Sequence, residues 1–312
     1  MKRIGYLYDK ICDCNNIRTA IYKSSRGKTK RHGVIRVLDN VDCYVNKIHY
    51  LLVNKLYFPS EFKVFKIYDS LNKKERIISK SKYFPDQIIQ YCLMNVLEPI
   101  LLKRFYNYSC GCIVGKGTSY GQKYIERIIK NDIKGSKYCL KMDIRKFYPS
   151  INKDILKNKF SKIIKDVDAL SLIYRIIDSN CDGIPLGNYT SGFFANFYLN
   201  DFDFFLKEIL GVKYYIRYID DLVILCGNKK RLSYVLNEVS KFLSSEKLIV
   251  KKNYQIFNVD YRDLDFLGFR FYHNKTILRK RNMFRISRRA RIICKKNVVN
   301  FKDACAMVSF FG

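Results

Sequence analysis

The chain has 312 residues, with 59 lysines and arginines against 28 acidic residues and a formal net charge of +31. Hydrophobic residues make up 48% of it, which is enough for a sizeable core and excludes a globally disordered protein, and the length allows two or three lobes. A folded chain with this excess of cations repels itself unless a polyanion is near, so nucleic acid is the expected partner and an acidic membrane surface a distant second.

The first third of the chain combines a basic segment with a helix and a hairpin. Residues 1–34 form a polar, basic extension, in which 23–32 is either a solvated loop or an arm that contacts phosphates. The spacing of apolar residues over 41–56 predicts a helix. Alternation over 62–68, followed by a basic turn and Ile77-Ile78, predicts a small β-hairpin with a Lys/Arg tip.

A long helix and a glycine-rich segment come next. Pro85 suits the first turn of a helix that extends to about residue 106, and Pro99 is expected to kink or divide it. Residues 109–122 are rich in glycine but lack the spacing of a P-loop. We interpret them as a connector whose N–H groups could contact phosphate, before a helix over 119–131.

The middle of the chain alternates strands with helices. Residues 137–143 predict a strand that ends at Asp143, followed by an aromatic-proline turn and then helix to about residue 178. A Gly/Pro/Asn turn precedes a long apolar helix from about Thr190. Beyond the hairpin at 213–227, we expect an amphipathic helix over 229–246, strands over 248–260 and 264–273, and a densely basic tail over 279–297.

The segment 213–227 places two adjacent acids, Asp220 and Asp221, between apolar runs. This pattern predicts a β-hairpin whose tight turn exposes both carboxylates. Adjacent acids in an apolar setting are costly unless a cation meets them, and Mg²⁺ is the natural partner of such oxygen ligands. The tetrapeptide alone leaves an ordinary Asp-Asp turn open.

Asp143 adds a third carboxylate at a strand end. The helix-rich segment that follows it can act as the crossover that brings its strand beside the 213–227 hairpin. Three carboxylates at adjoining strand ends can hold two divalent metals about 4 Å apart. The chemistry that this predicts is in-line nucleotidyl transfer.

The cysteines and histidines do not favour zinc. Of eleven cysteines, Cys12/Cys14 and Cys110/Cys112 form C-x-C pairs rather than the C-x₂-C pairs of zinc ribbons, and there are three histidines. We expect reduced, mostly buried thiols. No apolar run is long enough to cross a bilayer and the N-terminus lacks a signal-peptide core, so we expect a cytoplasmic protein with no membrane partner.

In order along the chain, these motifs resemble those of the reverse-transcriptase family. KMDIRKFYPSI resembles motif A with Asp143, and GIPLGNYTSGFFANFYL resembles motif B with Pro185, Gly187 and Ser191. YIDD resembles motif C, LDFLGFRF the primer-grip hairpin of motif E, and KKERIIS followed by PDQIIQ the fingers segment. The resemblance covers roughly residues 35–290.

The resemblance implies roles for individual residues. Catalysis would use Asp143, Asp220 and Asp221. These three residues and Ile144 would bind two Mg²⁺ ions, with Mn²⁺ as a possible substitute. The deoxynucleotide would contact Lys74, Arg76, Tyr148, Leu186 and Gly187, where Tyr148 is the steric gate beneath the sugar or, alternatively, a core tyrosine. Nucleic acid would contact Tyr218, Ser191, Arg279, Lys280, Arg281, Arg288 and Arg289.

The resemblance also implies an α+β right-hand polymerase with an antiparallel palm sheet. The expected parts are a basic extension (1–34), fingers (35–130), a palm (131–272), and a basic C-terminal segment or minimal thumb (273–312). The implied activity is RNA-directed DNA synthesis from a DNA or RNA primer on an RNA template, with a structured non-coding RNA and an accessory protein that completes the duplex clamp as further partners.

Within the family, the motifs resemble bacterial retroelement enzymes, above all those of diversity-generating retroelements and related antiphage defence groups. Leu186 matches the aliphatic residue of the diversity-generating enzymes, whereas Ser191-Gly192 departs from their usual Ser-Gln. The lysine expected in the strand after motif C falls near Asn253-Tyr254, and no role is assigned to the adjacent Lys251 and Lys252. Template-independent or self-primed synthesis and non-catalytic RNA binding remain alternatives.

Overall fold

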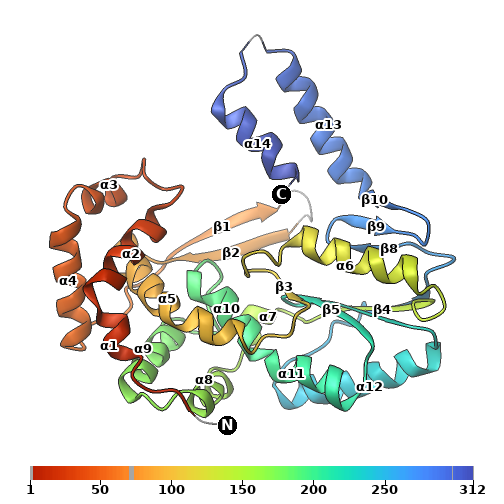
Figure 1. Cartoon of the computed structure of the whole chain (residues 1–312), viewed down its shortest axis with the longest axis horizontal. Coiled ribbons are helices and arrows are strands. Elements are labelled where there is room, and N and C mark those ends of the chain that lie inside the picture. Colours follow the sequence, from red (N-terminus) through yellow and green to blue (C-terminus); the bar gives the residue numbers. More distant parts are fainter. Residues whose placement is uncertain (1–2, 70–73, 297, 312) are drawn as a thin grey trace. The chain divides into compact units, whose positions relative to one another are not determined.

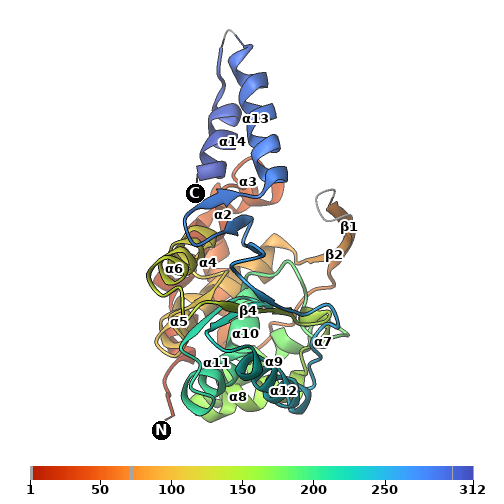
Figure 2. The same ribbon diagram turned by 90° about the vertical axis from the view of Figure 1, so that its right-hand side faces the viewer.

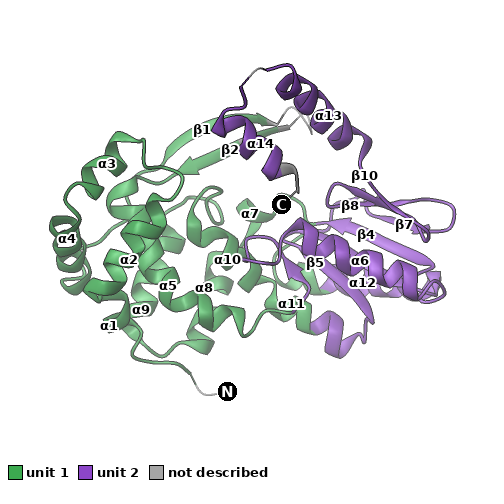
Figure 3. Ribbon diagram, turned by 45° about the horizontal axis from the view of Figure 1, so that its top comes forward, with its two compact units in different colours: residues 1–106, 144–204, 242–249 green, residues 107–143, 205–241, 250–312 purple. Residues whose placement is uncertain are grey.

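The computed structural model describes residues 3–69, 74–296 and 298–311. The chain divides into two compact units, coloured separately in Figure 3. Unit 1 consists of residues 1–106, 144–204 and 242–249, and unit 2 of residues 107–143, 205–241 and 250–312. Each unit is therefore built from several separate stretches of the chain.

Unit 1 is mainly helical and contains one β-hairpin (Figure 1). Its elements are α1 (Tyr8–Cys12), α2 (Cys14–Ser25), α3 (His32–Leu38), α4 (Val41–Val53), β1 (Lys63–Asp69), β2 (Lys74–Lys80), the π-helical turn η1 (Tyr83–Gln87), α5 (Ile88–Leu102), α7 (Phe147–Ser150), α8 (Lys153–Ile163), α9 (Val167–Asp178), α10 (Tyr189–Tyr198) and α11 (Asn200–Phe204).

Helix α5 lies at the centre of unit 1. Ile88, Leu93 and Leu97 are fully buried on it, and it packs against α2 and α10. Of the two outcomes expected at Pro99, a kink or a division, the division is wrong, because α5 continues through Pro99 to Leu102. The buried apolar residues on both sides of the proline outweigh the one backbone hydrogen bond that it cannot donate.

The predicted hairpin is confirmed as β1 and β2. The strands are antiparallel, in a register that runs from Lys63 opposite Lys80 to Asp69 opposite Lys74. The basic tip that joins them, residues 70–73, lies outside the described residues. The predicted helix over 41–56 is confirmed as α4, which ends at Val53.

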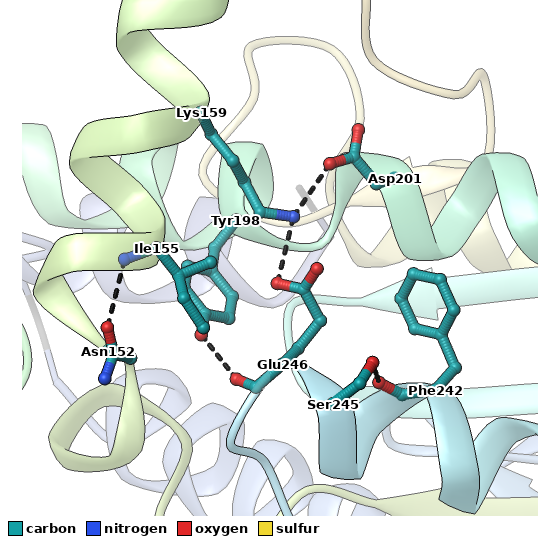
Figure 4. Close-up of polar contacts among 8 residues, drawn as sticks. All are labelled: Asn152, Ile155, Lys159, Tyr198, Asp201, Phe242, Ser245 and Glu246. Carbon is teal, nitrogen blue, oxygen red and sulfur yellow. Dashed lines mark hydrogen bonds and ion pairs between the residues drawn. The ribbon is translucent and has the colours of Figure 1, made fainter.

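A buried lysine ties three helical segments of unit 1 together (Figure 4). Lys159 on α8 is 7% exposed, and its Nζ lies 2.8 Å from Asp201 and 3.0 Å from Glu246. The Tyr198 hydroxyl at the end of α10 donates to the backbone carbonyl of Glu246. These contacts fix residues 242–249, the C-terminal end of α12 and the chain that follows it.

Unit 2 contains a five-stranded and a three-stranded sheet. Its elements are β3 (Ser109–Cys110), α6 (Thr118–Asn131), β4 (Tyr138–Asp143), the π-helical turn η2 (Phe205–Ile209), β5 (Tyr214–Tyr218), β6 (Asp221–Cys226), most of α12 (Lys229–Ser245), β7 (Gln255–Asn258), β8 (Leu264–Phe266), β9 (Phe269–Phe271), β10 (Thr276–Leu278), α13 (Lys280–Cys294) and α14 (Phe301–Phe311).

The larger sheet has the order β3-β5-β6-β4-β7. Its pairs are antiparallel except β3 with β5, which is parallel. In Figures 1 and 2, α6 and α12 lie on opposite sides of this sheet. Alternate residues serve the two faces: Ile216 and Val223 join the cluster that contains Ile125 of α6, whereas Ile224 lines a small cavity with residues of α12.

Several element boundaries in both units differ from the prediction. The strand expected over 248–260 begins only at Gln255, and the helix expected up to residue 178 is two helices, α8 and α9. The basic tail is helical, as α13, and packs against α14. Short strands β3 and β10 were not predicted, because two or three residues show no measurable periodicity.

The thiols are free, but the expectation that they are mostly buried is wrong. Only Cys12, Cys92, Cys110 and Cys139 are buried. Among the described residues, no helix combines the length and apolar character needed to cross a membrane.

Candidate active site

Unit 2 brings the three predicted carboxylates to one edge of its larger sheet. Strand β4 ends at Asp143 and β6 begins at Asp221, and these two residues face each other as partners in the antiparallel register. Asp220 lies in the two-residue turn that joins β5 to β6. The prediction of a hairpin at 213–227 beside the Asp143 strand is therefore confirmed.

The turn that presents Asp220 has an unusual backbone. Ile219 has φ of 57°, in the left-handed region. A β-branched residue rarely adopts this conformation, which costs about 1–3 kcal/mol and persists only where the surroundings impose it. The tight turn between right-twisted strands requires positive φ, and here an isoleucine supplies it in place of the usual Gly or Asn.

The carboxylates repel one another in a partly buried setting. Burial, followed by the charges of Asp143 and Asp221, raises the pKa of Asp220 to about 6. Burial and Asp143 also raise the pKa of Asp221, while Lys141, Lys251 and, more weakly, Arg279 act in the opposite direction. Raised pKa values at two acids that lie beside a third carboxylate at one sheet edge are typical of a site that binds cations.

Lys251 is the nearest cation to Asp143. Its Nζ forms an ion pair with Asp143 Oδ2, and its backbone N–H donates to the Asp143 carbonyl at 2.9 Å. No role was predicted for Lys251, because the lysine expected after motif C falls near Asn253-Tyr254. The strand expected around Lys251 is an irregular segment that pairs with the chain at Asp143.

Two further cations join the site through Asp265 of β8. Lys141 Nζ donates to the backbone carbonyl of Asp265, and the Arg279 guanidinium bonds its carboxylate, with Nε at 2.8 Å. Arg279, expected to contact nucleic acid, is therefore engaged within the protein. Lys141 was not predicted as a site residue, although it precedes Asp143 by two residues and so extends from the same face of β4.

The donor set fits divalent metal ions by chemistry. Carboxylate oxygens are the ligands that Mg²⁺ and Mn²⁺ prefer, and the buried Oδ1 of Asp143 has no hydrogen-bond partner in the part of the chain that the structure describes. Among the described residues, no group of three or more acids, histidines or cysteines is arranged so that it could hold a metal ion. Lys251 supplies positive charge where a metal would neutralise Asp143.

The residues expected to contact the deoxynucleotide belong to unit 1. Tyr148 lies in α7, half-buried, with its ring edge against Phe147 at 5.7 Å between centroids. Its carbonyl accepts the N–H of Ile184 at 3.1 Å. Gly183 lies so close to the backbone of Tyr148 and Pro149 that a Cβ there would overlap them, so only glycine allows this approach.

Leu186 and Gly187 are joined to the hairpin strand β2. The Leu186 carbonyl accepts the N–H of Ser79 at 2.9 Å, and Gly187 packs against the same strand. The backbones of Lys74 and Arg76 lie in β2, but their side chains lie outside what the structure describes. All the segments that the resemblance assigns to the nucleotide therefore belong to unit 1, and Tyr148 contacts the motif B segment through Gly183 and Ile184.

Three of the other predicted residues are at least partly buried. Ser191 is buried and its hydroxyl donates to the Pro185 carbonyl at 2.6 Å, which fixes the loop and gives no support to a direct contact with nucleic acid. Ile144 is fully buried at the start of a unit 1 segment. Tyr218 is half-buried at the end of β5, close to Gly111.

The basic residues of α13 divide into two groups. Arg289, with Lys296, binds Asp303 of α14, which is 1% exposed, so this arginine holds the two helices together. Arg288 instead lines a groove of about 550 Å³ with Phe284 and other residues of α13. Lys280 lies 5.7 Å from the centroid of the Phe284 ring, and Arg281 is exposed.

Unit 1 contains a basic groove that is lined in part by the segment 23–32. The sequence left open whether this segment is a solvated loop or an arm that contacts phosphates. Lys28, Arg31 and Lys80 line a cavity of about 380 Å³ together with Gly187 and Asn188. Burial, followed by the charges of Arg31 and Lys80, lowers the pKa of Lys28. This direction is expected where cations lie close together, and an anion bound between them would stabilise their charges.

The same groove offers groups that suit a nucleobase. Tyr91 and Tyr189 line it and stack with their ring centroids 3.8 Å apart. Asn188 is 8% exposed, and neither atom of its side-chain amide has a hydrogen-bond partner among the described residues. Cations, aromatic faces and an amide in one groove are typical of single-stranded nucleic-acid sites.

A protein-family model and a curated relative each match part of the chain. Residues 69–271 match the family model described as "Reverse transcriptase (RNA-dependent DNA polymerase)". A curated relative, the nuclear intron maturase 1 of Arabidopsis thaliana mitochondria, is 29% identical over 105 residues, which are 33% of this chain and 14% of the maturase. The matched region therefore spans a small part of that relative.

Solved telomerase structures share the fold at low sequence identity. Truncated apo telomerase from Candida tropicalis has a TM-score of 0.51 and 13% identity, over 74% of this chain and 59% of that chain. Telomerase from Candida albicans, in complex with a fragment of telomeric RNA, has a TM-score of 0.54 and 13% identity, over 75% of this chain and 51% of that chain. The likeness confirms the predicted α+β right-hand polymerase fold with an antiparallel sheet.

Proposed function

We propose that the chain, which belongs to the reverse-transcriptase family, is an RNA-directed DNA polymerase. Its proposed catalytic residues are Asp143, Asp220 and Asp221. The observation that carries the proposal is their convergence: a strand end, a strand start and the turn between two strands place three carboxylates at one sheet edge. A protein that only binds RNA gains nothing from three acids that would repel the phosphates.

Two Mg²⁺ ions, or Mn²⁺ in their place, would be held by the three carboxylates and by the backbone of Ile144, and would activate the primer 3′-hydroxyl and neutralise the leaving pyrophosphate. The chain's own part is to hold the three acids close together and to place cations beside them. Lys141 and Lys251 favour the ionised form of Asp221, and Lys251 holds Asp143 at the end of its strand.

The remaining nucleotide contacts are proposed by family resemblance. Tyr148 would lie beneath the sugar, with Leu186 and Gly187 beside the incoming nucleotide and Lys74 and Arg76 near its triphosphate. The attachment of Tyr148 to Gly183 and Ile184, and of Leu186 to Ser79, supports this set, because backbone contacts hold each part in place.

We propose the groove of Lys28, Arg31 and Lys80 as a path for single-stranded RNA template. The three cations would contact phosphates, while the stacked Tyr91 and Tyr189 would meet bases. The amide of Asn188, which has no hydrogen-bond partner within the described parts of the chain, would also meet a base. We propose that three basic residues of α13 contact the template–primer duplex: Lys280, Arg281 and Arg288. A structured RNA or an accessory protein would add further contacts to this duplex.

The activity is tested by replacing the turn acids. Asp220→Asn and Asp221→Asn should each lower Mg²⁺-dependent extension of a DNA primer on an RNA template by at least about 10²–10³-fold, because a neutral amide binds the metal ions that neutralise the transferring phosphoryl more weakly than a carboxylate does. Asp39→Asn, which changes an exposed acid of unit 1, serves as the control, and chelation of the metal should stop the wild type. Incorporation that survives in both acid variants would contradict the assignment.

For the biological role, we propose sequence diversification from a dedicated RNA in a bacterial retroelement, with Leu186 as the supporting residue. Gly192 after Ser191 departs from the diversity-generating pattern and leaves open the second candidate, an antiphage defence system. Sequencing the RNA and cDNA that co-purify with the protein separates them: adenine-specific errors indicate diversification, and faithful or repetitive cDNA from one non-coding RNA indicates defence.

Template-independent or self-primed synthesis is a further alternative to RNA-directed copying. It predicts products whose sequence does not depend on the RNA supplied. Sequencing products made with and without a defined template therefore distinguishes the two modes, and template-dictated products support the main proposal.

A further inference from the structure

We propose that Ser109, Cys110, Gly111 and Arg217 form a turn clamp that holds Ile219 in its left-handed conformation and thereby positions Asp220 for metal binding. The inference rests on the proposed function, since it deals with the same carboxylates. It gives a role to the SCGC segment, interpreted from sequence as a glycine-rich connector, and to an arginine that the sequence analysis did not consider.

The peptide groups on both sides of Ile219 are fixed by the clamp. The Ile219 N–H donates to the Cys110 carbonyl at 3.1 Å, and the Ile219 carbonyl accepts from Arg217 Nη1 at 2.9 Å. Because Ile219 has φ of 57°, which a β-branched residue does not hold unaided, these two bonds impose the conformation. The next residue along the chain is Asp220.

Arg217 is a fully buried cation, 0% exposed, and this burial needs a reason. Its Nη2 donates to the hydroxyl of Ser109 at 3.1 Å, and Ser109 is also 0% exposed. Ser109 and Arg217 are partners in the parallel pairing of β3 with β5. A planar guanidinium can bridge a carbonyl and a hydroxyl with two parallel donors, which a lysine ammonium cannot do in the same geometry.

Gly111 allows the loop to approach the turn. It has φ of 86°, and a Cβ added to it would lie 2.8 Å from Ile219 Cγ1 and 3.3 Å from the Tyr218 ring. Its N–H already donates to the Lys116 carbonyl at 2.9 Å, so this amide serves the loop rather than a phosphate. Only glycine satisfies both the backbone conformation and the close contact with Ile219.

Loss of the clamp should let Ile219 relax toward negative φ, which rotates the Asp220 peptide away from Asp143 and Asp221. The expected consequence is weaker metal binding, in the range of about 10–100-fold that loss of supporting groups around a metal site produces. The chemical step would fall with it, and raised metal concentration would restore part of the rate.

The test measures Mn²⁺ binding by electron paramagnetic resonance, without template or nucleotide, in Arg217→Met, Ser109→Ala and Gly111→Ala. All three should bind Mn²⁺ about 10–100-fold more weakly and show a raised KM for the metal. Adding Ile219→Asn to Arg217→Met should restore most of the affinity, because asparagine tolerates the left-handed conformation without the clamp.

Three control substitutions separate positioning from general destabilisation. Gly211→Ala introduces the same backbone strain at φ of 59° with nothing near the new methyl group, and Gly227→Ala creates a close approach of 2.7 Å to the Lys134 carbonyl at the far end of β6. Arg231→Met removes an exposed arginine of α12. Each should leave Mn²⁺ affinity at the wild-type value, whatever it does to thermal stability.

Two results would overturn the clamp. One is wild-type Mn²⁺ affinity in folded Arg217→Met and Ser109→Ala; the other is a loss that Ile219→Asn does not repair and that Gly211→Ala and Gly227→Ala share. Should Arg217→Met fail to fold, Ser109→Ala and Gly111→Ala decide the matter. The proposed polymerase activity would fail differently, through a wild type that binds Mn²⁺ but does not copy RNA.

Discussion

At the scale of single residues, Tyr148 shows how backbone contacts can define the position of a side chain. Its carbonyl accepts from Ile184, Gly183 packs on its backbone, and its ring meets Phe147 edge to face. A side chain so anchored cannot easily move aside from a ligand. This rigidity is what the proposed role as a steric gate requires.

Tyr148→Ala should therefore admit ribonucleotides. With the ring removed, the discrimination between dNTP and rNTP, measured as the ratio of kcat/KM values, should fall by about tenfold or more. Tyr148→Phe keeps the ring and should preserve the ratio. If the alanine variant incorporated deoxynucleotides with unchanged sugar selectivity, Tyr148 would be a core tyrosine and no gate.

The three acids of the candidate site were predictable from sequence, and the cations around them were not. Asp220 and Asp221 stand out because adjacent carboxylates in an apolar run have a high desolvation cost. Arg217 and Lys251 look like two of many basic residues, since nothing local shows that one is fully buried and the other pairs with Asp143. Their surroundings come from β3 and β4, which are distant in sequence.

At the scale of elements, long periodic segments were predicted well and short or irregular ones were not. Helices α4, α6 and α12 follow the spacing of their apolar residues closely. Strand β3 has two residues, and its position is determined by pairing with β5 rather than by its own sequence. Tertiary pairing of this kind leaves no periodic signal in the chain.

The Lys159 tie makes a prediction about helix packing in unit 1. Lys159→Met should lower the free energy of unfolding by about 2 kcal/mol, less than for a fully buried pair because Asp201 is more than half exposed and is screened by water. The loss arises mainly from Glu246, whose side chain is 17% exposed and would keep an unpaired charge. Urea unfolding measures it.

The double variant Lys159→Met with Glu246→Gln provides the control. Removing the stranded charge should recover part of the loss, since a neutral amide is cheaper to bury than a carboxylate. A Lys159→Met protein as stable as the wild type, or a double variant less stable than the single one, would show that the buried lysine does not tie these helices.

At the scale of the whole molecule, the net charge of +31 overstates the cations that can meet nucleic acid. Lys159 and Lys251 pair with acids, Arg217 is buried, and Arg279 and Arg289 bind carboxylates within unit 2. Composition predicted a polyanionic partner but could not show which cations are engaged internally. The groove around Lys28 stands out because burial and the nearby charges of Arg31 and Lys80 lower the pKa of Lys28.

Salt dependence tests whether that groove binds single-stranded RNA. Lys28→Gln and Lys80→Gln should weaken binding of an RNA oligonucleotide and reduce the slope of log Kd against log salt by about 0.7 for each phosphate that the variant no longer neutralises. Lys162→Gln, an exposed lysine of α8 outside the groove, should leave the slope unchanged. Equal slopes in all three variants would place the template elsewhere.

Asn188→Ala, which removes no charge, should weaken binding without altering the slope, because its amide is proposed to contact a base.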